Sequence, residues 1–316
     1  MEEPDAQSQV ATHEPVLSAE AAAFLLPQKS GLVVDCTLGL GGHAEVLLRH
    51  SEVELIGIDR DPEAIRIATE RLAPFGSRFR AICGDFADLE GILEATATRP
   101  VSGVLADLGV SSLQLTSPER GFSFQRNGPL DMRMGPQESN ARDVVNSYSE
   151  VQLERIFRDY GEEKHARRIA AVITARRKSG EITTTRQLRQ IVVEAKGHAA
   201  RPGRRRIDPA TKVFQALRIE VNRELESLEK LLEQGIRRLD TDGRIVIISY
   251  HSLEDRIVKN VFRHGQKGDV DPVTGQSVSE SQVLEVLTRR PIRPSDREVA
   301  SNPRSRSARL RAARRL

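Results

Sequence analysis

The chain has 316 residues, of which 38% are hydrophobic and only 4% are aromatic, and it contains no tryptophan. This length allows two domains or one large domain, with a core that must be mainly aliphatic. Its two cysteines lack a CxxC partner, its seven histidines show no metal-ligand spacing, and no apolar run reaches the length of a membrane span. We therefore expect a reduced, cytoplasmic protein without a bound metal.

Charge is distributed unevenly along the chain. The formal net charge is +3, but the segment from Thr288 to Leu316 holds ten arginines and two acids, a charge of +8 that leaves −5 on the remainder. We expect residues 301–316 to form a basic C-terminal arm that binds an anionic polymer, although a solvated tail has the same composition. The acidic and polar residues 1–12 predict a disordered N-terminal tail.

The first strong pattern spans residues 32–59. An apolar run ends in Asp35, a glycine cluster and a helix-like segment follow, and a second apolar run ends in Asp59. This order of strand, glycine turn, helix, strand and acid predicts half of a nucleotide-binding α/β unit. Residues 39–44 have the G-x-G-x-x-A spacing that is typical of the glycine turn in such a unit. A plain tight turn in an α/β protein is the alternative.

Asp35 indicates which nucleotide this unit binds. Its carboxylate, at the carboxyl end of the first strand, would repel a pyrophosphate but attract the cationic methionine head of S-adenosylmethionine. The pattern therefore favours S-adenosylmethionine over NAD as the cofactor. Asp59, at the end of the second strand, is placed to accept hydrogen bonds from the hydroxyls of a ribose.

The third predicted strand also ends in polar residues. It covers residues 78–83, after a helix over residues 62–72, and it leads into Gly84, Asp85 and Phe86. An acid and an aromatic side chain at this point of an α/β sheet would lie beside a bound adenine. A helix-capping Asp85 with Phe86 in the core is the alternative.

The fourth predicted strand, residues 101–105, leads to Asp107. The nitrogen of an exocyclic amine on a base is a poor nucleophile because its lone pair is delocalised into the ring, so an acceptor for its N–H assists methyl transfer. Asp107 is the candidate for that role, and capping of a helix is its alternative function. Methylation at carbon would need a cysteine nucleophile, and neither Cys36 nor Cys83 is well placed for one.

The α/β pattern stops between residues 114 and 208. Helical periodicity without strand alternation predicts an inserted all-helical domain there, with helices over residues 150–160, 164–178 and 185–195. Clusters of basic residues within it suit contacts with nucleic acid and equally suit solvated helix faces. These clusters lie at residues 164–168, 176–178 and 201–206.

The α/β pattern returns after this insertion. A continuous apolar stripe predicts one sheet-packing helix over residues 209–239, and residues 244–250 form a buried fifth strand. The polar segment 250–256 follows, at the sheet edge where Asp107 is expected. This position favours a role in the active cleft, although Ser252 as a helix N-cap explains the segment equally well.

Nine motifs together resemble one known family. They are His13-x-Pro-Val-Leu17, Asp35-x-Thr-x-Gly-x-Gly-Gly-His43, Ile58-Asp-Arg-Asp-Pro62, Gly84-Asp-Phe86, Asp107-Leu-Gly-Val-Ser-Ser-x-Gln114, Arg120-Gly-Phe-Ser-Phe124, Pro129-Leu-Asp-Met-Arg-Met134, Tyr250-His-Ser-Leu-Glu-Asp255 and Asn302-Pro-Arg-Ser-x-Ser-Ala-x-Leu-Arg311. In these motifs the chain resembles the bacterial 16S ribosomal RNA cytosine-N4 methyltransferases over nearly its whole length after residue 12.

The resemblance implies a fold, an activity and a set of partners. The fold is a class I S-adenosylmethionine-dependent methyltransferase sheet, residues 13–113 and 209–300, with an inserted helical domain at residues 114–208. The activity is N4-methylation of a cytidine in 16S ribosomal RNA at the decoding centre of the 30S subunit. The implied cofactor-binding residues are Gly41, Gly42, His43, Asp59, Phe86, Asp107 and Gln114, with Asp107 also catalytic.

The motifs do not identify the aromatic residue that stacks on the target base. Phe122, Phe124 and Tyr250 are the candidates, and His251 and Ser252 are further candidates for contact with the substrate. Three other functions suit parts of the pattern: methylation of adenine N6 or of a small molecule, a dehydrogenase on the same fold, and a non-catalytic assembly factor that binds ribosomal RNA. A monomer and a homodimer are both compatible with the sequence.

Overall fold

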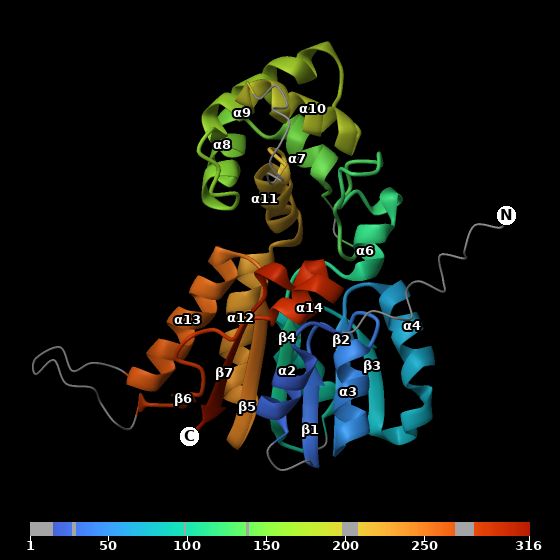
Figure 1. Ribbon diagram of the computed structural model, residues 1–316, viewed down its shortest axis with the longest axis vertical. Coiled ribbons are helices and arrows are strands. Elements are labelled where there is room, and N and C mark those ends of the chain that lie inside the picture. Colours follow the sequence, from blue (N-terminus) through green and yellow to red (C-terminus); the bar gives the residue numbers. More distant parts are fainter. Residues whose placement is uncertain (1–14, 27–29, 98, 137–138, 198–207, 269–280) are drawn as a thin grey trace, which may run out of the picture. The chain divides into compact units, whose positions relative to one another are not determined.

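A computed structural model describes residues 15–26, 30–97, 99–136, 139–197, 208–268 and 281–316. The chain forms two compact units, shown in Figure 1. Unit 1 comprises residues 1–109 and 225–316, and unit 2 comprises residues 110–224. Compared with the predicted insertion at residues 114–208, unit 2 extends further on its C-terminal side. The predicted N-terminal tail, residues 1–12, lies outside the described residues.

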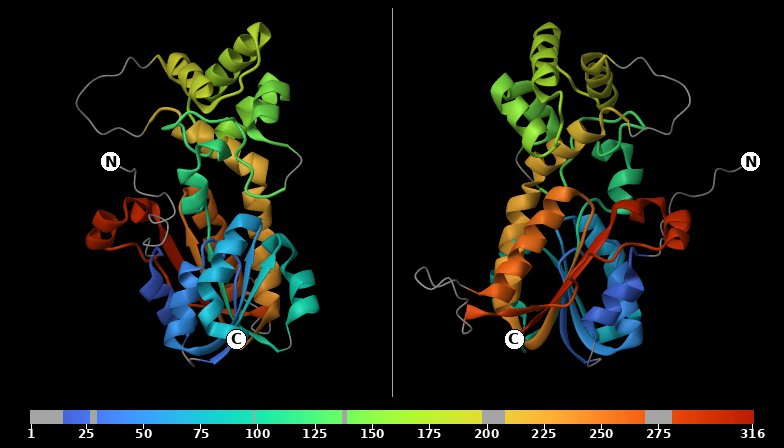
Figure 2. Two further views of the ribbon diagram at one scale, coloured as in Figure 1. Left: turned by 90° about the vertical axis from the view of Figure 1, so that its right-hand side faces the viewer. Right: turned by 60° about the vertical axis from the view of Figure 1, so that its left-hand side comes forward.

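Unit 1 is built on one seven-stranded sheet with the strand order β3-β2-β1-β4-β5-β7-β6. Its strands are β1 (Ser30–Asp35), β2 (Glu52–Asp59), β3 (Phe79–Cys83), β4 (Val101–Asp107), β5 (Leu239–Ser249), β6 (Leu284–Val286) and β7 (Arg309–Arg315). Strands β1 to β5 pair in parallel, whereas β7 pairs antiparallel with both β5 and β6. The predicted α/β class is confirmed, and Figure 2 shows the sheet from two further sides.

Helices cover both faces of this sheet, as a doubly wound fold requires. They are α2 (Ser18–Leu25), α3 (Gly42–His50), α4 (Pro62–Leu72), α5 (Leu89–Thr96), α12 (Glu224–Arg238), α13 (Ser252–Lys267) and α14 (Asp296–Ser301), with the 3-10 turns η1 (Ala73–Arg78), η2 (Phe86–Asp88) and η6 (Pro303–Ser307). Neighbouring residues of β1 face opposite sides because side chains alternate along a strand. Val33 packs with residues of α2, α3 and α4, whereas Val34 packs with residues of α5, α12 and α13.

Local chemistry explains where α4 begins. The side chain of Asp61 accepts a hydrogen bond from the backbone N–H of Glu63 at 3.1 Å, and Pro62 occupies the first helical position. A capping aspartate followed by a proline is a strong start signal because both suit the unpaired N–H groups of a first turn. The predicted start of this helix is confirmed.

The prediction of a free basic C-terminal arm is wrong for the part that forms β7. Arg309–Arg315 lies between β5 and β6, and Leu310 and Ala312 are fully buried. Arg311 is neutralised inside the fold, with its Nε 2.7 Å from Oδ1 of Asp255. Small and aliphatic residues at alternating positions suit a central strand, and the high arginine content conceals this pattern.

The single helix predicted over residues 209–239 is also wrong. Helix α11 (Thr211–Asn222) ends at Arg223, whose φ of 51° is left-handed, and α12 begins directly afterwards. Val213 of α11 is buried in the core of unit 2, whereas Leu228 of α12 is buried in the core of unit 1. One unbroken apolar stripe therefore serves two cores, and helical periodicity alone does not locate the break.

Unit 2 is helical, as predicted. It contains α6 (Ser112–Thr116), α7 (Ala141–Ser147), α8 (Glu150–Asp159), α9 (Ala166–Arg176), α10 (Thr185–Lys196) and α11, with the 3-10 turns η3 (Pro118–Arg120) and η4 (Arg177–Ser179). Helices α6, α7, α8 and α10 each begin with a capping box, in which two side chains satisfy backbone N–H groups reciprocally. No helix in the described ranges has the length and hydropathy of a membrane span.

Two arginines of the predicted basic cluster at residues 176–178 are engaged within unit 2. Arg176 pairs with Glu194 at 2.7 Å, and Arg177 donates a hydrogen bond to the carbonyl of Val145 at 2.8 Å, so both are engaged within the unit. The cluster at residues 201–206 lies outside the described residues.

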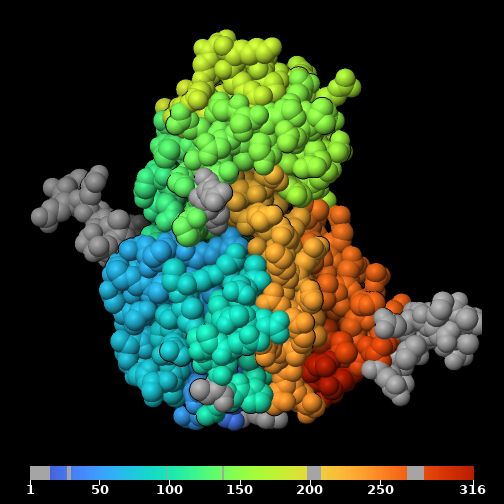
Figure 3. Space-filling model, turned by 180° about the vertical axis from the view of Figure 1, so that it is seen from behind, coloured from blue at the N-terminus to red at the C-terminus, as the bar shows by residue number. Residues whose placement is uncertain are grey.

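Helix α12 packs beside α5 and is joined to this region by hydrogen bonds, and the two helices lie next to each other on the face shown in Figure 3. Oε1 of Gln234 accepts a hydrogen bond from the N–H of Glu90 at 2.7 Å, and its Nε2 donates to the carbonyl of Ala87 at 2.8 Å. This one amide thus satisfies one backbone group in η2 and one at the start of α5. The polar side of α12 thereby supports the region that follows β3.

Candidate active site

The predicted glycine turn connects β1 to α3 at the carboxyl edge of the sheet. Gly39 and Gly41 have φ values of 51° and 79°, a left-handed conformation that favours glycine. A Cβ on Gly41 would lie 3.0 Å from Cδ1 of Leu72, and one on Gly42 would lie 3.3 Å from Cβ of Pro15. The turn therefore has no room for larger side chains, and it leads into a helix N-terminus whose first N–H groups lack intrahelical partners.

Asp59 ties this turn to the end of β2. Its Oδ2 accepts a hydrogen bond from the N–H of Gly39 at 2.8 Å, and its Oδ1 accepts one from the N–H of Asp61 at 2.9 Å. Burial raises the pKa of Asp59, and the two backbone hydrogen bonds partly offset that rise. Because each carboxylate oxygen has two lone pairs, this half-buried group retains capacity for further donors.

Asp35 presents a buried oxygen that has no partner. Its side chain is 1% exposed, and its Oδ1 accepts a hydrogen bond from the N–H of Thr37 at 3.1 Å. Its Oδ2 forms no hydrogen bond with any of the described residues. Burial raises the pKa of Asp35 to about 6, against the opposing charge of His43. An unsatisfied buried acceptor is costly, so this oxygen is suited to a donor that arrives with a ligand.

The carboxylate of Asp107, at the end of β4, lies between two side chains. The hydroxyl of Tyr250 donates a hydrogen bond to Oδ1 at 2.8 Å, and Nε2 of His43 lies 3.3 Å from Oδ2. The backbone N–H of Asp107 donates to Oγ1 of Thr37 at 2.6 Å, which holds this residue against the glycine turn. The alternative role of Asp107 as a helix cap is wrong, because Ser111 caps the next helix, α6.

The pKa values of both neighbours of Asp107 are raised, but for different reasons. Burial, followed by the charge of Asp107, raises the pKa of Tyr250 far above its usual range, so its hydroxyl keeps its proton and donates. Burial lowers the pKa of His43, but the hydrogen bond and charge of Asp107, together with the charge of Asp35, raise it above its usual value. His43 therefore has a tendency to carry the positive charge that stabilises both carboxylates.

Asp85 and Phe86 follow β3 as predicted. Asp85 caps η2 by accepting a hydrogen bond from the N–H of Ala87 at 2.9 Å, and it also accepts one from Arg60 at 2.9 Å. The guanidinium carbon of Arg60 lies 5.5 Å from the centre of the Phe86 ring, which is half-buried at the edge of the core. The capping role of Asp85 is confirmed, and Phe86 retains an exposed part for contact with a ligand.

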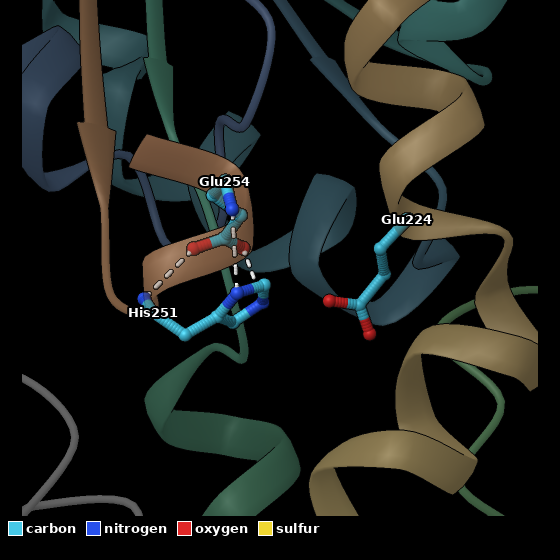
Figure 4. Close-up of side chains that lie close together, drawn as sticks. All are labelled: Glu224, His251 and Glu254. Atoms are coloured by element: carbon cyan, nitrogen blue, oxygen red, sulfur yellow. Dashed lines mark hydrogen bonds and ion pairs between the residues drawn. The ribbon is translucent and has the colours of Figure 1, made fainter. Parts of the chain in front are cut away.

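The polar segment after β5 begins α13, and its N-cap is His251 rather than Ser252. Nδ1 of His251 accepts a hydrogen bond from the N–H of Glu254 at 3.4 Å, and Oε2 of Glu254 accepts one from the N–H of His251 at 3.2 Å (Figure 4). The prediction of Ser252 as the cap is wrong, because Ser252 is already the first helical residue. Glu224, also labelled in Figure 4, accepts two hydrogen bonds from Arg218 within unit 2, both at 2.8 Å.

Three predicted site residues belong to unit 2. Gln114 is 5% exposed, and its Oε1 accepts a hydrogen bond from the N–H of Ser111 at 3.0 Å in a capping box. Phe122 is buried in the core of unit 2, and Phe124 packs edge-to-face on Phe214 with ring centres 4.9 Å apart. The contact of these residues with cofactor or base stays a prediction.

Neither cysteine has the character of a nucleophile. Cys36 is fully buried, and burial raises the pKa of its thiol well above the usual value. Cys83 is exposed, and the pKa of its thiol is raised first by partial burial and then by the charge of Asp59. Because the thiolate is the reactive form, both side chains are poorly suited to a covalent step.

Two residues that support this site, Thr37 and Arg60, were not predicted from the sequence. The hydroxyl of Thr37 holds the backbone of Asp107, and Arg60 covers part of Phe86. The signal for Thr37 is its position two residues after Asp35 in the glycine motif, and the signal for Arg60 is its position directly after Asp59.

The fold and the site together define a class of protein. Unit 1 has a doubly wound sheet with the order β3-β2-β1-β4-β5-β7-β6 and one antiparallel strand, a glycine turn after β1, and acids as the last residues of β1, β2 and β4. These features define a class I S-adenosylmethionine-dependent methyltransferase. The site of this class lies at the carboxyl ends of the parallel strands, where Asp35, Asp59 and Asp107 are found.

Comparison with known proteins identifies the family. The sequence matches the MraW methylase family over residues 10–316. It is 48% identical over 306 residues to a ribosomal RNA small subunit methyltransferase H from Persephonella marina. This alignment covers 96% of this chain and 99% of the relative. Relatives of the same name from Geobacter sulfurreducens and Carboxydothermus hydrogenoformans are 48% and 45% identical, over 310 and 312 residues. These two alignments each cover 96% of this chain, and 99% and 98% of the relatives. The chain therefore belongs to the MraW methylase family and is a methyltransferase.

Proposed function

We propose that this chain methylates the exocyclic N4 of a cytidine in 16S ribosomal RNA, with S-adenosylmethionine as the methyl donor. The observation that carries the proposal is the carboxylate of Asp107, held by Tyr250 and His43 at the carboxyl end of β4. The names of the three relatives support a small-subunit ribosomal RNA substrate. The decoding centre as the target, the 30S subunit as the partner and the cytoplasm as the location belong to the same proposal.

The residues around the glycine turn fit S-adenosylmethionine. The unpartnered Oδ2 of Asp35 suits the ammonium group of the methionine head, and the half-buried carboxylate of Asp59 suits ribose hydroxyls. When bound, S-adenosylmethionine supplies a methyl group attached to a positively charged sulfur. Together with Asp35, the residues that we assign to the cofactor are Gly41, Gly42, His43, Asp59, Phe86, Asp107 and Gln114.

Asp107 acts on the amine that receives the methyl group. Its two oxygens offer about four lone-pair positions, so the hydrogen bond from Tyr250 and the contact with His43 leave room for an N–H of the base. Accepting that N–H increases the electron density on N4 and orients the amine for attack. The proton that N4 loses on methylation passes to a carboxylate oxygen of Asp107 or to water.

The base reaches this site only when it is unstacked from its neighbours. Phe122, Phe124 and Tyr250 are the proposed aromatic partners of the base, and His251 and Ser252 are the proposed polar contacts. Among these, Tyr250 has the strongest support because its hydroxyl already contacts the assigned catalytic carboxylate. We assign Tyr250 a positioning role towards Asp107, whether or not its ring also touches the base.

Transfer of a labelled methyl group to 30S particles and to naked 16S ribosomal RNA, with identification of the modified nucleoside, tests the function. The expected product is N4-methylcytidine, and Asp107→Ala is expected to lose most of the activity. A product of N6-methyladenosine would replace the proposal by adenine methylation. A protein that binds RNA but not S-adenosylmethionine would be an assembly factor. A protein that binds NAD but not S-adenosylmethionine would be a dehydrogenase.

A further inference from the structure

The arginines near the C-terminus divide into two groups with different surroundings. Those of β7 are held within the sheet, and Arg311 and Arg314 pair there with Asp255 and Glu285. Six earlier arginines are all exposed and lie in the segment that leads into β7. We call this group the edge arginines: Arg289, Arg290, Arg293, Arg297, Arg304 and Arg306.

Most of the edge arginines have no counter-charge among the described residues. Only two acids, Asp296 and Glu298, occur in the same segment, and Glu298 is engaged by the backbone N–H of Leu17 at 2.8 Å. Like charges gathered in one segment repel each other unless an anion neutralises them. Within the described part of the chain, no side-chain ion pair or hydrogen bond is formed by Arg289, Arg290, Arg293, Arg297 and Arg306.

The opposite edge of the same sheet shows the contrast. Arg49 lies in the last turn of α3 just before β2, Arg99 precedes β4, and Arg237 precedes β5, so all three lie near the amino ends of parallel strands. Each of them is paired with an acid, as Arg99 is with Glu54 at 3.0 Å. These three exposed arginines of unit 1 are therefore neutralised, whereas Arg289, Arg290, Arg293, Arg297 and Arg306 form no ion pair with any described residue.

The edge arginines lie on a segment with a fixed backbone at the carboxyl edge. Ser249, the residue before Tyr250, pairs with Arg309, so the chain enters β7 beside the end of β5. Ser305 is fully buried, and Ile292 forms a bridge with Leu310. Figure 1 shows α14, in red, near the start of α2 in unit 1, in agreement with the hydrogen bond between Glu298 and Leu17.

We propose that the edge arginines bind phosphates of the RNA substrate and so position the RNA at the sheet edge that carries Asp107. The identity of the polymer rests on the proposed function. A planar guanidinium binds phosphate through two parallel hydrogen bonds, which suits arginine better than lysine. Because the segment is anchored by buried residues, its arginines are presented with less loss of conformational entropy than those of a flexible tail.

Two variants with the same change in net charge test this inference. The edge variant is R293Q/R297Q/R306Q, and the control variant is R49Q/R99Q/R237Q. We measure the dissociation constant of each full-length protein for naked 16S ribosomal RNA over a series of salt concentrations. Three lost phosphate contacts should reduce the slope of log affinity against log salt by about 2, and should weaken binding roughly 10- to 100-fold at about 0.1 M salt. The control variant should keep the wild-type slope.

Three further measurements separate the possible causes. Binding of S-adenosylmethionine and the Tm should match wild type in the edge variant, and R293K/R297K/R306K should keep most of the slope. If the edge variant does not fold, the single variant R297Q should still reduce the slope by about 0.7. Equal slopes for the edge and control variants, or a lysine variant that binds as weakly as the glutamine variant, would overturn the inference.

The proposed function and this inference fail in different ways. Wild-type protein that binds RNA with an edge-dependent slope but transfers no methyl group to it would refute the function and leave the RNA-binding surface in place. Wild-type protein that methylates 16S ribosomal RNA, with an edge variant that binds as tightly as the control, would refute the surface and leave the function in place.

Discussion

Replacement of Tyr250 by Phe tests whether its hydroxyl positions the catalytic carboxylate. The change removes one donor, 2.8 Å from Oδ1 of Asp107, and leaves the ring in place. Burial and the charge of Asp107 keep the pKa of Tyr250 so high that the hydroxyl donates at every working pH. A buried hydrogen bond to a charged group contributes about 1.5–3 kcal/mol. We therefore expect kcat to fall roughly 10- to 100-fold, with little change in the binding of S-adenosylmethionine.

Single-turnover methyl transfer to 16S ribosomal RNA measures this effect. Tyr148→Phe is a matched control, because the hydroxyl of Tyr148 donates to Oε1 of Glu220 in unit 2, also at 2.8 Å. The control should lose stability but keep kcat. A positioning role also predicts that Tyr250→Phe has little further effect in an Asp107→Ala background. Full activity of Tyr250→Phe would refute the reasoning. So would a fall in kcat on adding Tyr250→Phe to Asp107→Ala that is as large as the fall in the wild type.

Three other changes have defined outcomes. The pKa of Asp35 is raised from 3.8 to about 6. The proton on Asp35 therefore contributes its full stabilisation of the folded protein below pH 3.8, and this stabilisation is lost as the pH rises through about 6. The free energy of unfolding of Asp35→Asn should therefore exceed that of the wild type by up to about 3 kcal/mol at neutral pH. The same variant should bind S-adenosylmethionine more weakly, as measured by calorimetry. Wild-type binding should tighten as the pH rises through about 6, and a constant affinity across that range would contradict the assignment. Deletion of residues 302–316 removes β7 and should abolish folding, so a truncated chain with native circular dichroism would count against this strand. Gly41→Ala places a Cβ at a φ of 79° and 3.0 Å from Leu72, and should lower stability by about 1–3 kcal/mol in urea; an unchanged midpoint would show that the turn relaxes.

Patterns within short segments predicted most helices and the parallel strands. Asp61 and Pro62 located the start of α4, and periodicity located α8 and α10, because capping and amphipathicity depend on residues a few positions apart. The break at Arg223 escaped prediction because the apolar stripe continues across it. Which core each half of that stripe enters depends on two different sets of packing partners.

The C-terminal arginines illustrate a second limit. Composition alone treats the ten arginines of residues 288–316 as one basic segment. In the structure, Arg311 is 7% exposed and neutralised by Asp255, whereas Arg297 is exposed on α14. A charge acts on a partner only where it is accessible and unpaired, and neither property is a function of composition.

By itself, the sequence determined the order of strand, glycine turn, helix, strand and acid around Asp35 and Asp59, because these features depend on residues close together in the chain. The family followed from nine short motifs spread over nearly the whole sequence. Only the tertiary structure decided that the hydroxyl of Tyr250 lies against Asp107, which is 143 residues away in sequence, and that Arg309–Arg315 is an internal strand. A hydrogen bond between the ends of two strands exists only when the sheet has brought those ends together, and no local pattern encodes that distance.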